Sequence, residues 1–433
     1  MPGASAVYQI ENSGQVLRGR GKGPRFRFSR PRVSQTVLML GLTSMFTDIS
    51  AEMVSSILPM YLVLGLHLSP LAFGVIDGLY LGVAAIVRLL SGFMADRSRR
   101  HKEIAVAGYS LSAFSRLGLL VVGGVWLWLA VVVLIDRLGK GIRTAPRDAM
   151  ISLSSQRQNL ATAFGVHRSL DTAGAMIGPL VAFGLLMLTP GAYNSIFVVS
   201  LCVALIGLGV LTLFVPKPSA AVIDPNADAP PPPSLRAAFD LARGSQFGLL
   251  VAIGTILSLA TMSDSFLYLT LQRRLDFNAG FFPLLYVATA LIFMVLAIPM
   301  GQLADLFGRG RVFIAGYGVL LVVYALLLMP WLGTAQIAIS LILLGIYYAA
   351  TDGVLMALAS ALLPEDLRTS GLALLTTGTN LGRLAASILF GLLWTWQGMS
   401  VAIWSFIVGL MAATCLAAFL FASPRFRMAS HAE

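Results

Sequence analysis

The chain has 433 residues, of which 57% are hydrophobic and 11% are charged, and its net charge is +11. A soluble globular protein carries about 25% charged residues because its surface faces water, so this composition excludes a soluble protein. It also excludes a disordered chain, and two cysteines are too few for a disulfide scaffold. What remains is a polytopic membrane protein, in which each span takes about 20 apolar residues.

Basic residues are concentrated at the amino terminus. The first 34 residues hold one acid, Glu11, against seven basic residues, which are Arg18, Arg20, Lys22, Arg25, Arg27, Arg30 and Arg32. This stretch has neither an apolar core nor a small-residue cleavage site, so it does not resemble a signal peptide. We expect residues 1–34 to form a basic cytoplasmic tail beside anionic lipid. A basic patch without a folded domain around it does not indicate a nucleic-acid partner.

Apolar runs separated by short polar segments predict twelve membrane-spanning helices. Their expected ranges are 35–65, 70–95, 103–122, 125–148, 158–188, 193–215, 245–271, 280–304, 311–331, 335–362, 368–396 and 399–422. Lysine and arginine are frequent in alternate loops, whereas the intervening loops hold only Arg273 and Arg274. Because cytoplasmic loops are enriched in basic residues, both termini are expected in the cytoplasm.

The longest polar stretch, residues 216–244, divides the chain into two similar halves. It contains four consecutive prolines and is typical of an extended linker. On either side of it, G-F-M-A-D-R at 92–97 recurs as G-Q-L-A-D-L at 301–306, which indicates an internal repeat. The predicted units are a six-helix half at 35–215, the cytoplasmic linker 216–244, a second six-helix half at 245–422 and a cytoplasmic tail at 423–433.

Four motifs at matching helices make the chain resemble the major facilitator superfamily, from about residue 35 to 422. The motif after the second helix, G-x-x-x-D-[RK]-x-G-x-[RK]-[RK], is matched by Gly92, Asp96, Arg97 and Lys102. Its second copy is matched by Gly301, Asp305, Gly308 and Arg311. The fourth-helix motif R-x-x-x-G is matched by Arg137 and Gly141, and the fifth-helix motif G-x-x-x-G-P by Gly174, Gly178 and Pro179. Two positions that are usually glycine after the last motif are Val181 and Ala182.

The run D-R-L-G-K-G-I-R-T-A-P-R-D at 136–148 also resembles a poorly characterised prokaryotic branch of this superfamily. The resemblance implies an all-α membrane fold of two six-helix halves, in the inner (plasma) membrane of a prokaryote. It further implies a monomer that binds a small-molecule solute and lipid, without a cofactor.

The resemblance also implies a gate on the cytoplasmic side. Asp96 would meet the amino terminus of the eleventh helix, where unpaired N–H groups and the helix dipole favour a negative charge. The basic residues after it would reach Asp148 at the end of the fourth helix, and both contacts would hold the cytoplasmic side shut. The alternative is that Arg97 and Lys102 only determine topology.

Charged residues within the predicted spans are candidates for function, because each is costly in lipid unless it is paired or hydrated. Helices 1, 4, 7 and 10 line the central cavity of the superfamily, so the resemblance assigns seven residues to a substrate and proton-coupling cavity: Asp48, Glu52, Asp136, Arg137, Lys140, Asp264 and Asp352. Asp48 and Glu52 lie one turn apart on one helix face. A carboxylate in such a cavity can exchange protons near neutral pH. Elsewhere we expect structural ion pairs between helices, which involve Asp77 and Arg88 and also Arg168 and Asp171.

No sequence motif indicates an enzyme, a metal site or ATP-driven transport, since metal-ligand spacings, a nucleophile elbow and a P-loop are all lacking. The leading hypothesis is a secondary active transporter that works by alternating access, as a proton-coupled antiporter that exports a small organic solute. A proton-coupled symporter that imports an organic anion is the alternative. A receptor or scaffold without transport is a distant third, because it would not need acids inside the membrane.

Overall fold

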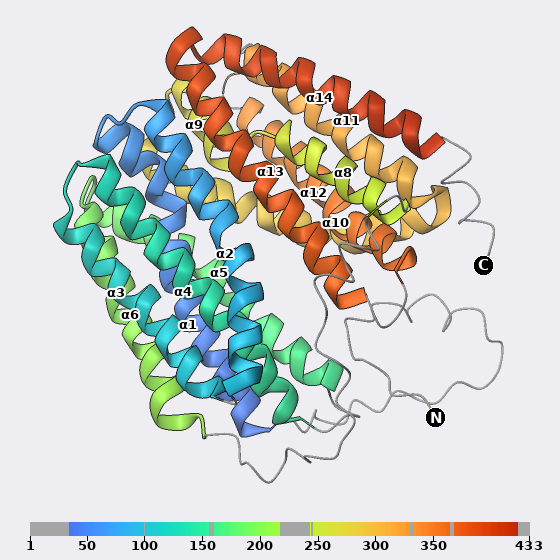
Figure 1. Ribbon diagram of the computed structural model, residues 1–433. Coiled ribbons are helices and arrows are strands. Elements are labelled where there is room, and N and C mark those ends of the chain that lie inside the picture. The colour runs from blue at the N-terminus through green and yellow to red at the C-terminus, as the bar shows by residue number, and fades with distance from the viewer. Residues whose placement is uncertain are drawn as a thin grey trace, which may run out of the picture.

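The structure, a computed structural model, describes residues 34–98, 100–155, 160–216, 243, 246–329, 333, 335–363 and 368–422. Among these, the side chains of residues 89–90, 92–98, 160–161 and 368–370 are not described. The predicted basic tail, most of the predicted linker and the predicted carboxy-terminal tail lie outside the described ranges. Every secondary-structure element in those ranges is a helix, and the helices form two bundles side by side (Figure 1). This confirms the predicted all-α class.

The first bundle follows the predicted order of spans. It contains α1 (Gln35–Met60), the π-helix η1 (Tyr61–Gly65), α2 (Pro70–Ser98), α3 (His101–Val121), α4 (Trp126–Leu153), α5 (Leu160–Leu188) and α6 (Tyr193–Phe214). Helix α1 packs against α5 and α6, and α4 packs against α2 and α3.

The second bundle has the same number of spans, but the first of them is broken in two. It contains α8 (Gln246–Leu259), α9 (Asp264–Leu275), the short helix η4 (Ala279–Phe281), α10 (Phe282–Phe307), α11 (Arg309–Leu328), α12 (Ala335–Ala361), α13 (Arg368–Gln397) and α14 (Met399–Ala422). Helix α12 packs against α10 and α11, and α13 packs against α8 and α14.

Ten segments of the described chain are long and apolar enough to cross a membrane, counting α8 with α9 as one. Helices α4 and α13 have the length of a span, with 28 and 30 residues, but carry more polar residues. With these two, the arrangement is that of twelve spans. The outer surface of the bundles is apolar, as lipid contact requires, and it exposes large side chains such as Leu213, Ile298 and Phe419.

The first helix changes form close to its end. Ser34 caps α1 by accepting a hydrogen bond of 3.3 Å from the backbone N–H of Val37. Pro59, inside the last turn, has no N–H to donate and crowds the preceding turn. The chain then widens into the π-helix η1. This form is rare in proteins, and where it occurs it is often at a functional site.

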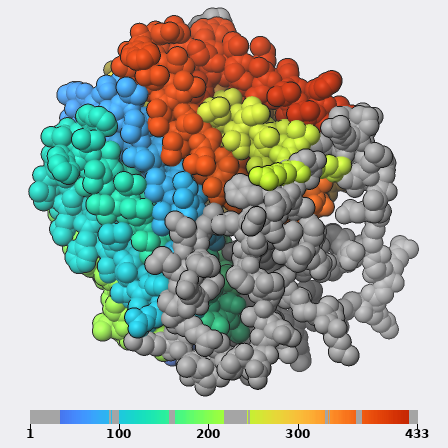
Figure 2. All heavy atoms as spheres, viewed as in Figure 1, coloured from blue at the N-terminus to red at the C-terminus, as the bar shows by residue number. Residues whose placement is uncertain are grey.

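The two bundles meet most extensively along α2 and α13, which lie side by side (Figures 1 and 2). Glycines allow the backbones to touch, because a Cβ on Gly74 would lie 2.5 Å from the carbonyl oxygen of Ser387. A Cβ on Gly78 would lie 2.8 Å from the carbonyl oxygen of Leu384, and one on Gly391 would collide with the carbonyl oxygen of Pro70. Small residues of this kind allow close helix packing in membranes. We call these residues of α2 and α13 the glycine seam.

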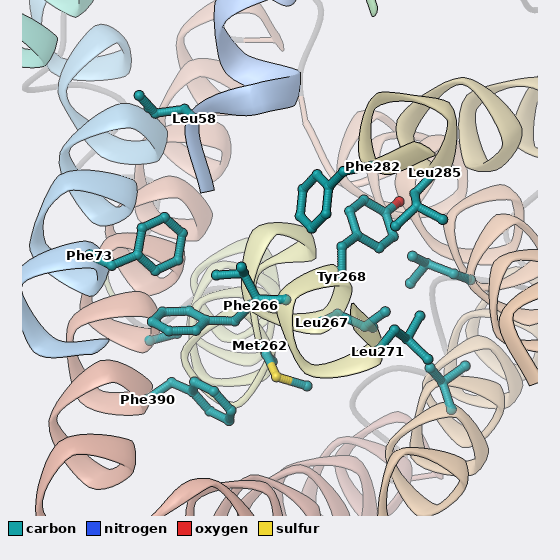
Figure 3. Close-up of a cluster of buried hydrophobic side chains, with 14 of the residues drawn as sticks. Leu58, Phe73, Met262, Phe266, Leu267, Tyr268, Leu271, Phe282, Leu285 and Phe390 are labelled. Atoms are coloured by element: carbon teal, nitrogen blue, oxygen red, sulfur yellow. The ribbon is translucent and has the colours of Figure 1, made fainter. Parts of the chain in front are cut away.

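Aromatic side chains extend the contact between the bundles. Phe73 of α2 points toward Phe266 of α9 and Phe390 of α13 (Figure 3). The ring centres of Phe73 and Phe266 are 4.8 Å apart, as are those of Phe266 and Phe390, with Trp394 completing the cluster. The aromatic cluster and the glycine seam occupy the end of the bundles at which α2 begins and α13 ends. The Phe183–Phe281 contact of α5 with η4 joins the bundles at the same end.

Candidate functional site

A cavity of about 250 Å³ lies between the two bundles. Helices α1, α2 and α4 form one wall, and the other comes from residues 261–265 together with α10, α12 and α13. Among the described residues, five charged side chains line it, namely Glu52, Asp77, Lys140, Asp264 and Arg383. The volume is near the lower end of the range for small-molecule sites. The cavity can therefore hold a small polar solute in contact with both bundles.

The break in the seventh span places polar groups at this cavity. Helix α8 ends at Leu259, and α9 begins after Ser263, whose hydroxyl accepts from the N–H of Phe266 at 3.4 Å. The N–H of Met262 donates to the hydroxyl of Tyr324 over 2.6 Å, which satisfies one of the backbone groups that the break releases. Transporters commonly place such discontinuous helices at the binding site.

Glu52 of α1 lies in the wall formed by the first bundle. It accepts a hydrogen bond of 2.6 Å from the hydroxyl of Ser55, one turn further along the same helix. Ser55, Tyr80 and Lys140 line the cavity next to it. The structure thus brings together two predicted cavity residues, Glu52 and Lys140, in one wall.

Asp264, the first residue of α9, lies in the opposite wall. It accepts a hydrogen bond of 2.6 Å from the hydroxyl of Tyr348 on α12. Tyr286 and Tyr347 line the same side, and the hydroxyl of Tyr286 lies 3.2 Å from that of Ser265. Each tyrosine offers a flat apolar ring and a hydroxyl, which suits a solute with a ring and polar edges.

Asp136 and Arg137 are not among the residues that line this cavity. Asp136 is buried within the first bundle, where it pairs with Arg116 of α3 at 3.1 Å and with the adjacent Arg137. The hydroxyl of Ser115 also donates to Asp136 at 3.5 Å. Arg137 in turn lies over the ring of Tyr80, 3.8 Å from its centre. The predicted cavity acid Asp136 is therefore the centre of a buried ion cluster behind the cavity wall.

Asp48 is separated from Glu52 in its contacts, although both lie on one face of α1. Its carboxylate faces Arg143 of α4 at 3.7 Å. Asp48 also lies near Asp171 of α5, which Arg147 approaches at 3.9 Å while it pairs with Asp148 at 2.9 Å. Asp48 is not among the residues that line the cavity, and neither is Asp352, which is exposed on α12.

The predicted pair of Asp77 with Arg88 does not form. Arg88 pairs with Asp148 of α4 at 3.2 Å, while Asp77 accepts a hydrogen bond of 2.7 Å from the hydroxyl of Ser387 on α13. A spacing of three turns puts both residues on one face of α2 but leaves them too far apart to touch. The predicted pair of Arg168 with Asp171 is present at 3.4 Å, within α5 and with an exposed arginine, so it does not join two helices.

Of the predicted gate residues in the first bundle, the structure describes the side chain of Lys102 but not those of the residues at the end of α2. The side chains of Gly92, Asp96 and Arg97 lie outside the described residues, and their backbone forms the last turns of α2. The ammonium group of Lys102 donates to the carbonyl oxygens of Thr212 and Val215, where it complements the end of α6.

In the second copy of the motif, Arg309 and Asp305 pair at 3.1 Å. Between them, Gly308 has a φ of 96°, a conformation that glycine adopts without strain, and it separates α10 from α11. Arg311 follows in the first turn of α11, and a Cβ on Gly301 would meet open space.

The fifth-helix motif holds α5 tightly against α1. A Cβ on Gly174 would collide with the carbonyl oxygen of Met45, and one on Gly178 would lie 2.7 Å from the carbonyl oxygen of Ile49 and 2.9 Å from the Cβ of Glu52. Pro179 is buried beside them. The motif therefore positions the segment of α1 that carries Glu52.

Several cavity residues were not singled out as site residues from the sequence. They are the tyrosines Tyr80, Tyr286, Tyr347 and Tyr348 and the serines of the helix break, with Arg383. The pair Tyr347-Tyr348 in the middle of an apolar run was an available signal. So was Ser263 followed by an acid, which is typical of a helix start. Among the described residues, no group of three or more histidine, cysteine, aspartate or glutamate side chains could hold a metal ion.

Solved structures with the same fold are membrane transporters. A mutant of the nucleoside transporter NupG matches with a TM-score of 0.74 at 14% identity, over 89% of this chain and 100% of its own. A bacterial homologue of the human lysosomal transporter Spinster, in an inward-facing and unoccupied conformation, matches with a TM-score of 0.72 at 15% identity, over 93% of this chain and 99% of its own.

Sequence relatives lead to the same family. An uncharacterised MFS-type transporter of Methanocaldococcus jannaschii is 31% identical over 373 residues, or 84% of this chain and 89% of the relative. An uncharacterised protein of Mycobacterium bovis is 30% identical over 307 residues, or 66% of this chain and 69% of the relative. The profile of the Major Facilitator Superfamily matches residues 40–296 and 251–432. The chain belongs to the major facilitator superfamily, and it is a membrane transporter rather than an enzyme.

Proposed function

We propose that this transporter exchanges protons for a small organic solute and exports the solute. The observation that carries the proposal is the cavity between the bundles, to which each bundle contributes a hydrogen-bonded carboxylate, Glu52 on one side and Asp264 on the other. A site shared by two bundles is what alternating access requires, because rocking one bundle against the other exposes it to each side in turn.

Protonation of these carboxylates supplies a physical link between proton and solute. Once protonated, Glu52 carries no charge, and the cavity around it closes at a lower cost in free energy. A solute that displaces the proton would then travel in the opposite direction. The fifth-helix motif, which is commoner among antiporters of the superfamily, favours export.

Two cations in the cavity favour a second candidate function. Lys140 and Arg383 line it from opposite bundles, and a guanidinium with an ammonium group can bind a carboxylate or phosphate. The alternative is therefore a symporter that imports an organic anion with protons. Antiport predicts that solute outside drives protons out of a vesicle, whereas symport predicts that it drives them in.

The test is solute-dependent proton movement in proteoliposomes that contain a trapped pH-sensitive dye. Nucleosides, amino acids, hexoses and small carboxylates are first screened by thermal shift, and the stabilising solute is then added outside. We expect alkalinisation of the lumen, and its loss in Glu52→Gln, because glutamine keeps the size of the side chain but cannot carry a proton. Binding measured by thermal shift should persist in that variant.

The matched control is Asp276→Asn, which removes an exposed carboxylate at the end of α9 and should leave proton movement unchanged. Asparagine tolerates the left-handed backbone of this position, where φ is 46°. Acidification of the lumen would show that the protein is a symporter and not an antiporter. Solute flux without proton movement in the parent protein would contradict proton coupling altogether.

A further inference from the structure

Asp77 is a buried carboxyl group that bridges the two bundles without a cation. It belongs to α2, is only 6% exposed, and accepts a hydrogen bond of 2.7 Å from Ser387 of α13, which is fully buried. The hydroxyl groups of Ser263, which caps α9, and of Ser265, in its first turn, lie close to the same carboxyl group. Three hydroxyl groups of the second bundle therefore surround one carboxyl group of the first.

The charged and titratable groups around Asp77 do not neutralise it. No ion pair involves Asp77 among the described residues. Asp264 of α9 and Tyr286 of α10 are near enough to interact with it. Arg383 lies one turn from Ser387 on α13, and it lines the cavity together with Glu52 and Lys140 without pairing with Asp77. Burying an ionised carboxylate without a paired cation costs free energy, and a neighbouring acid adds repulsion.

Asp77 has access to two regions of the protein. Its position in α2 lies within the glycine seam, one turn from Gly74 and next to Gly78. We call the end of the bundles that the seam holds together the closed end. It also lines the central cavity. A proton bound at this carboxyl group when the closed end is open can therefore leave later through the cavity.

We propose that Asp77 is a proton-carrying latch, which in its neutral form bonds α2 to α13 and α9 and holds the closed end of the transporter shut. A neutral carboxyl group both accepts from Ser387 and donates its own proton to a serine oxygen of α9, so all its polar atoms are used. Loss of the proton leaves an unpaired negative charge in the seam, and hydration of that charge favours opening. The latch rests on the proposed proton coupling and on the expected topology, in which this closed end faces outward.

The experiment measures how readily the cavity is reached from outside. Cys202 and Cys415, which are both free and exposed, are replaced by alanine. Thr261→Cys then places a similar-sized thiol in the cavity wall, and Ser195→Cys places an exposed reference thiol at the start of α6. Intact cells are treated with an impermeant thiol reagent from about pH 5.5 to about pH 8.5. The rate at Thr261→Cys is divided by the rate at the reference, since thiols react faster at high pH.

We expect the normalised rate to rise about tenfold with external pH, as ionisation shifts the population toward the open state. In Asp77→Asn the normalised labelling rate should remain low at every pH, because asparagine is neutral and can still bond to Ser387 and to a serine of α9. In Ser387→Ala the thiol of Thr261→Cys should label faster at acidic pH, because one hydrogen bond of the latch is lost. Its labelling rate should still rise with pH, because Asp77 is present. Asp276→Asn should behave as the parent does.

Three results would overturn the latch. The first is a pH response in Asp77→Asn equal to that of the parent. The second is a rate that follows external Na⁺ rather than pH, which would make Asp77 part of a cation site. The third is a reference thiol that does not label from outside, since the closed end would then face the cytoplasm. Chromatography of each purified variant identifies misfolding, and Ser387→Ala tests the same contact if Asp77→Asn does not fold. Labelling needs no solute, so a failed latch is distinct from failed antiport.

Discussion

Asp136 shows how a single residue keeps its charge inside the first bundle. Its carboxylate contacts the guanidinium groups of Arg116 and Arg137, and all three side chains are at most 6% exposed. The guanidinium group of Arg137 also lies over the ring of Tyr80, which gives this cation a second favourable contact. A buried group of two cations and one anion is stable only while the anion is present, because each unpaired charge is costly away from water. The acid therefore serves the stability of the bundle.

Replacing this acid should destabilise the protein. In Asp136→Asn, two buried arginines lose their counter-ion, and we expect a loss of about 3 kcal/mol or more of unfolding free energy. The measurement is the unfolding midpoint in detergent, with Asp276→Asn as the control for removing a carboxylate. A variant as stable as the parent, but with transport that no longer depends on pH, would make Asp136 a coupling acid instead.

Residues one turn apart can have different neighbours, which limits what sequence spacing predicts. The resemblance assigns both Asp48 and Glu52 to the cavity because the first helix lines it in the superfamily, and the two residues share one face of that helix. In the structure Asp48 faces Arg143 of α4, whereas Glu52 bonds to Ser55 at the cavity. Spacing along a helix identifies the face but not the partner helix, whose tilt decides which residues it reaches. The same reason explains why Arg88 pairs with Asp148 rather than with Asp77.

Helices α2 and α13 can pack closely because each has glycines that face the backbone of the other. Their backbones touch where Gly74 and Gly78 face carbonyl oxygens of α13, and Gly391 faces α2 in return. A methyl group at these positions would require the two helices to separate by several tenths of an ångström or more, because a backbone carbonyl cannot rotate away. The glycine seam is thus sensitive to side-chain size at the end of the bundles that is closed in the structure.

Gly74→Ala should weaken this closed state. Its Cβ would lie 2.5 Å from the carbonyl oxygen of Ser387, so the variant can relieve the contact by opening the seam. We expect faster external labelling of Thr261→Cys at all pH values, by a factor of about 5 to 20, which corresponds to about 1–2 kcal/mol. Gly209→Ala is the control, since a Cβ there meets nothing within 4 Å. Labelling that is equally slow in both variants would show that the seam adjusts without opening.

For the molecule as a whole, the order of the spans is predictable from the length and spacing of the apolar runs alone. The predicted ranges 70–95, 193–215 and 399–422 agree with α2, α6 and α14 to within a few residues. Hydrophobic length is a strong constraint because the bilayer has a nearly constant thickness. The break between α8 and α9 was not predicted, because it is only four residues long and lies within an apolar run, where Ser263 and Asp264 mark a new helix start. The cavity depends on how the two bundles pack against each other, and the pattern of apolar residues does not predict that packing.

The arrangement of the bundles determines from which side of the membrane the cavity can be reached. The contacts described between the bundles, the glycine seam, the aromatic cluster and Phe183–Phe281, all lie at one end. The charges of the loops predict that this end faces outward, with both termini and the linker in the cytoplasm. In intact cells an impermeant thiol reagent should therefore label Ser195→Cys but neither Ser219→Cys nor Ser430→Cys.

In everted vesicles the pattern should reverse, and Thr261→Cys should label with the cytoplasmic group, because the bundles are joined at the opposite end. Labelling of Ser219→Cys and Ser430→Cys in intact cells would invert the topology. Equal labelling of Thr261→Cys from both sides would mean that the two states are similarly populated at rest, since a difference of only about 1.4 kcal/mol already gives a tenfold preference. The ratio of the two rates therefore measures how strongly the seam and the latch favour the closed outer end.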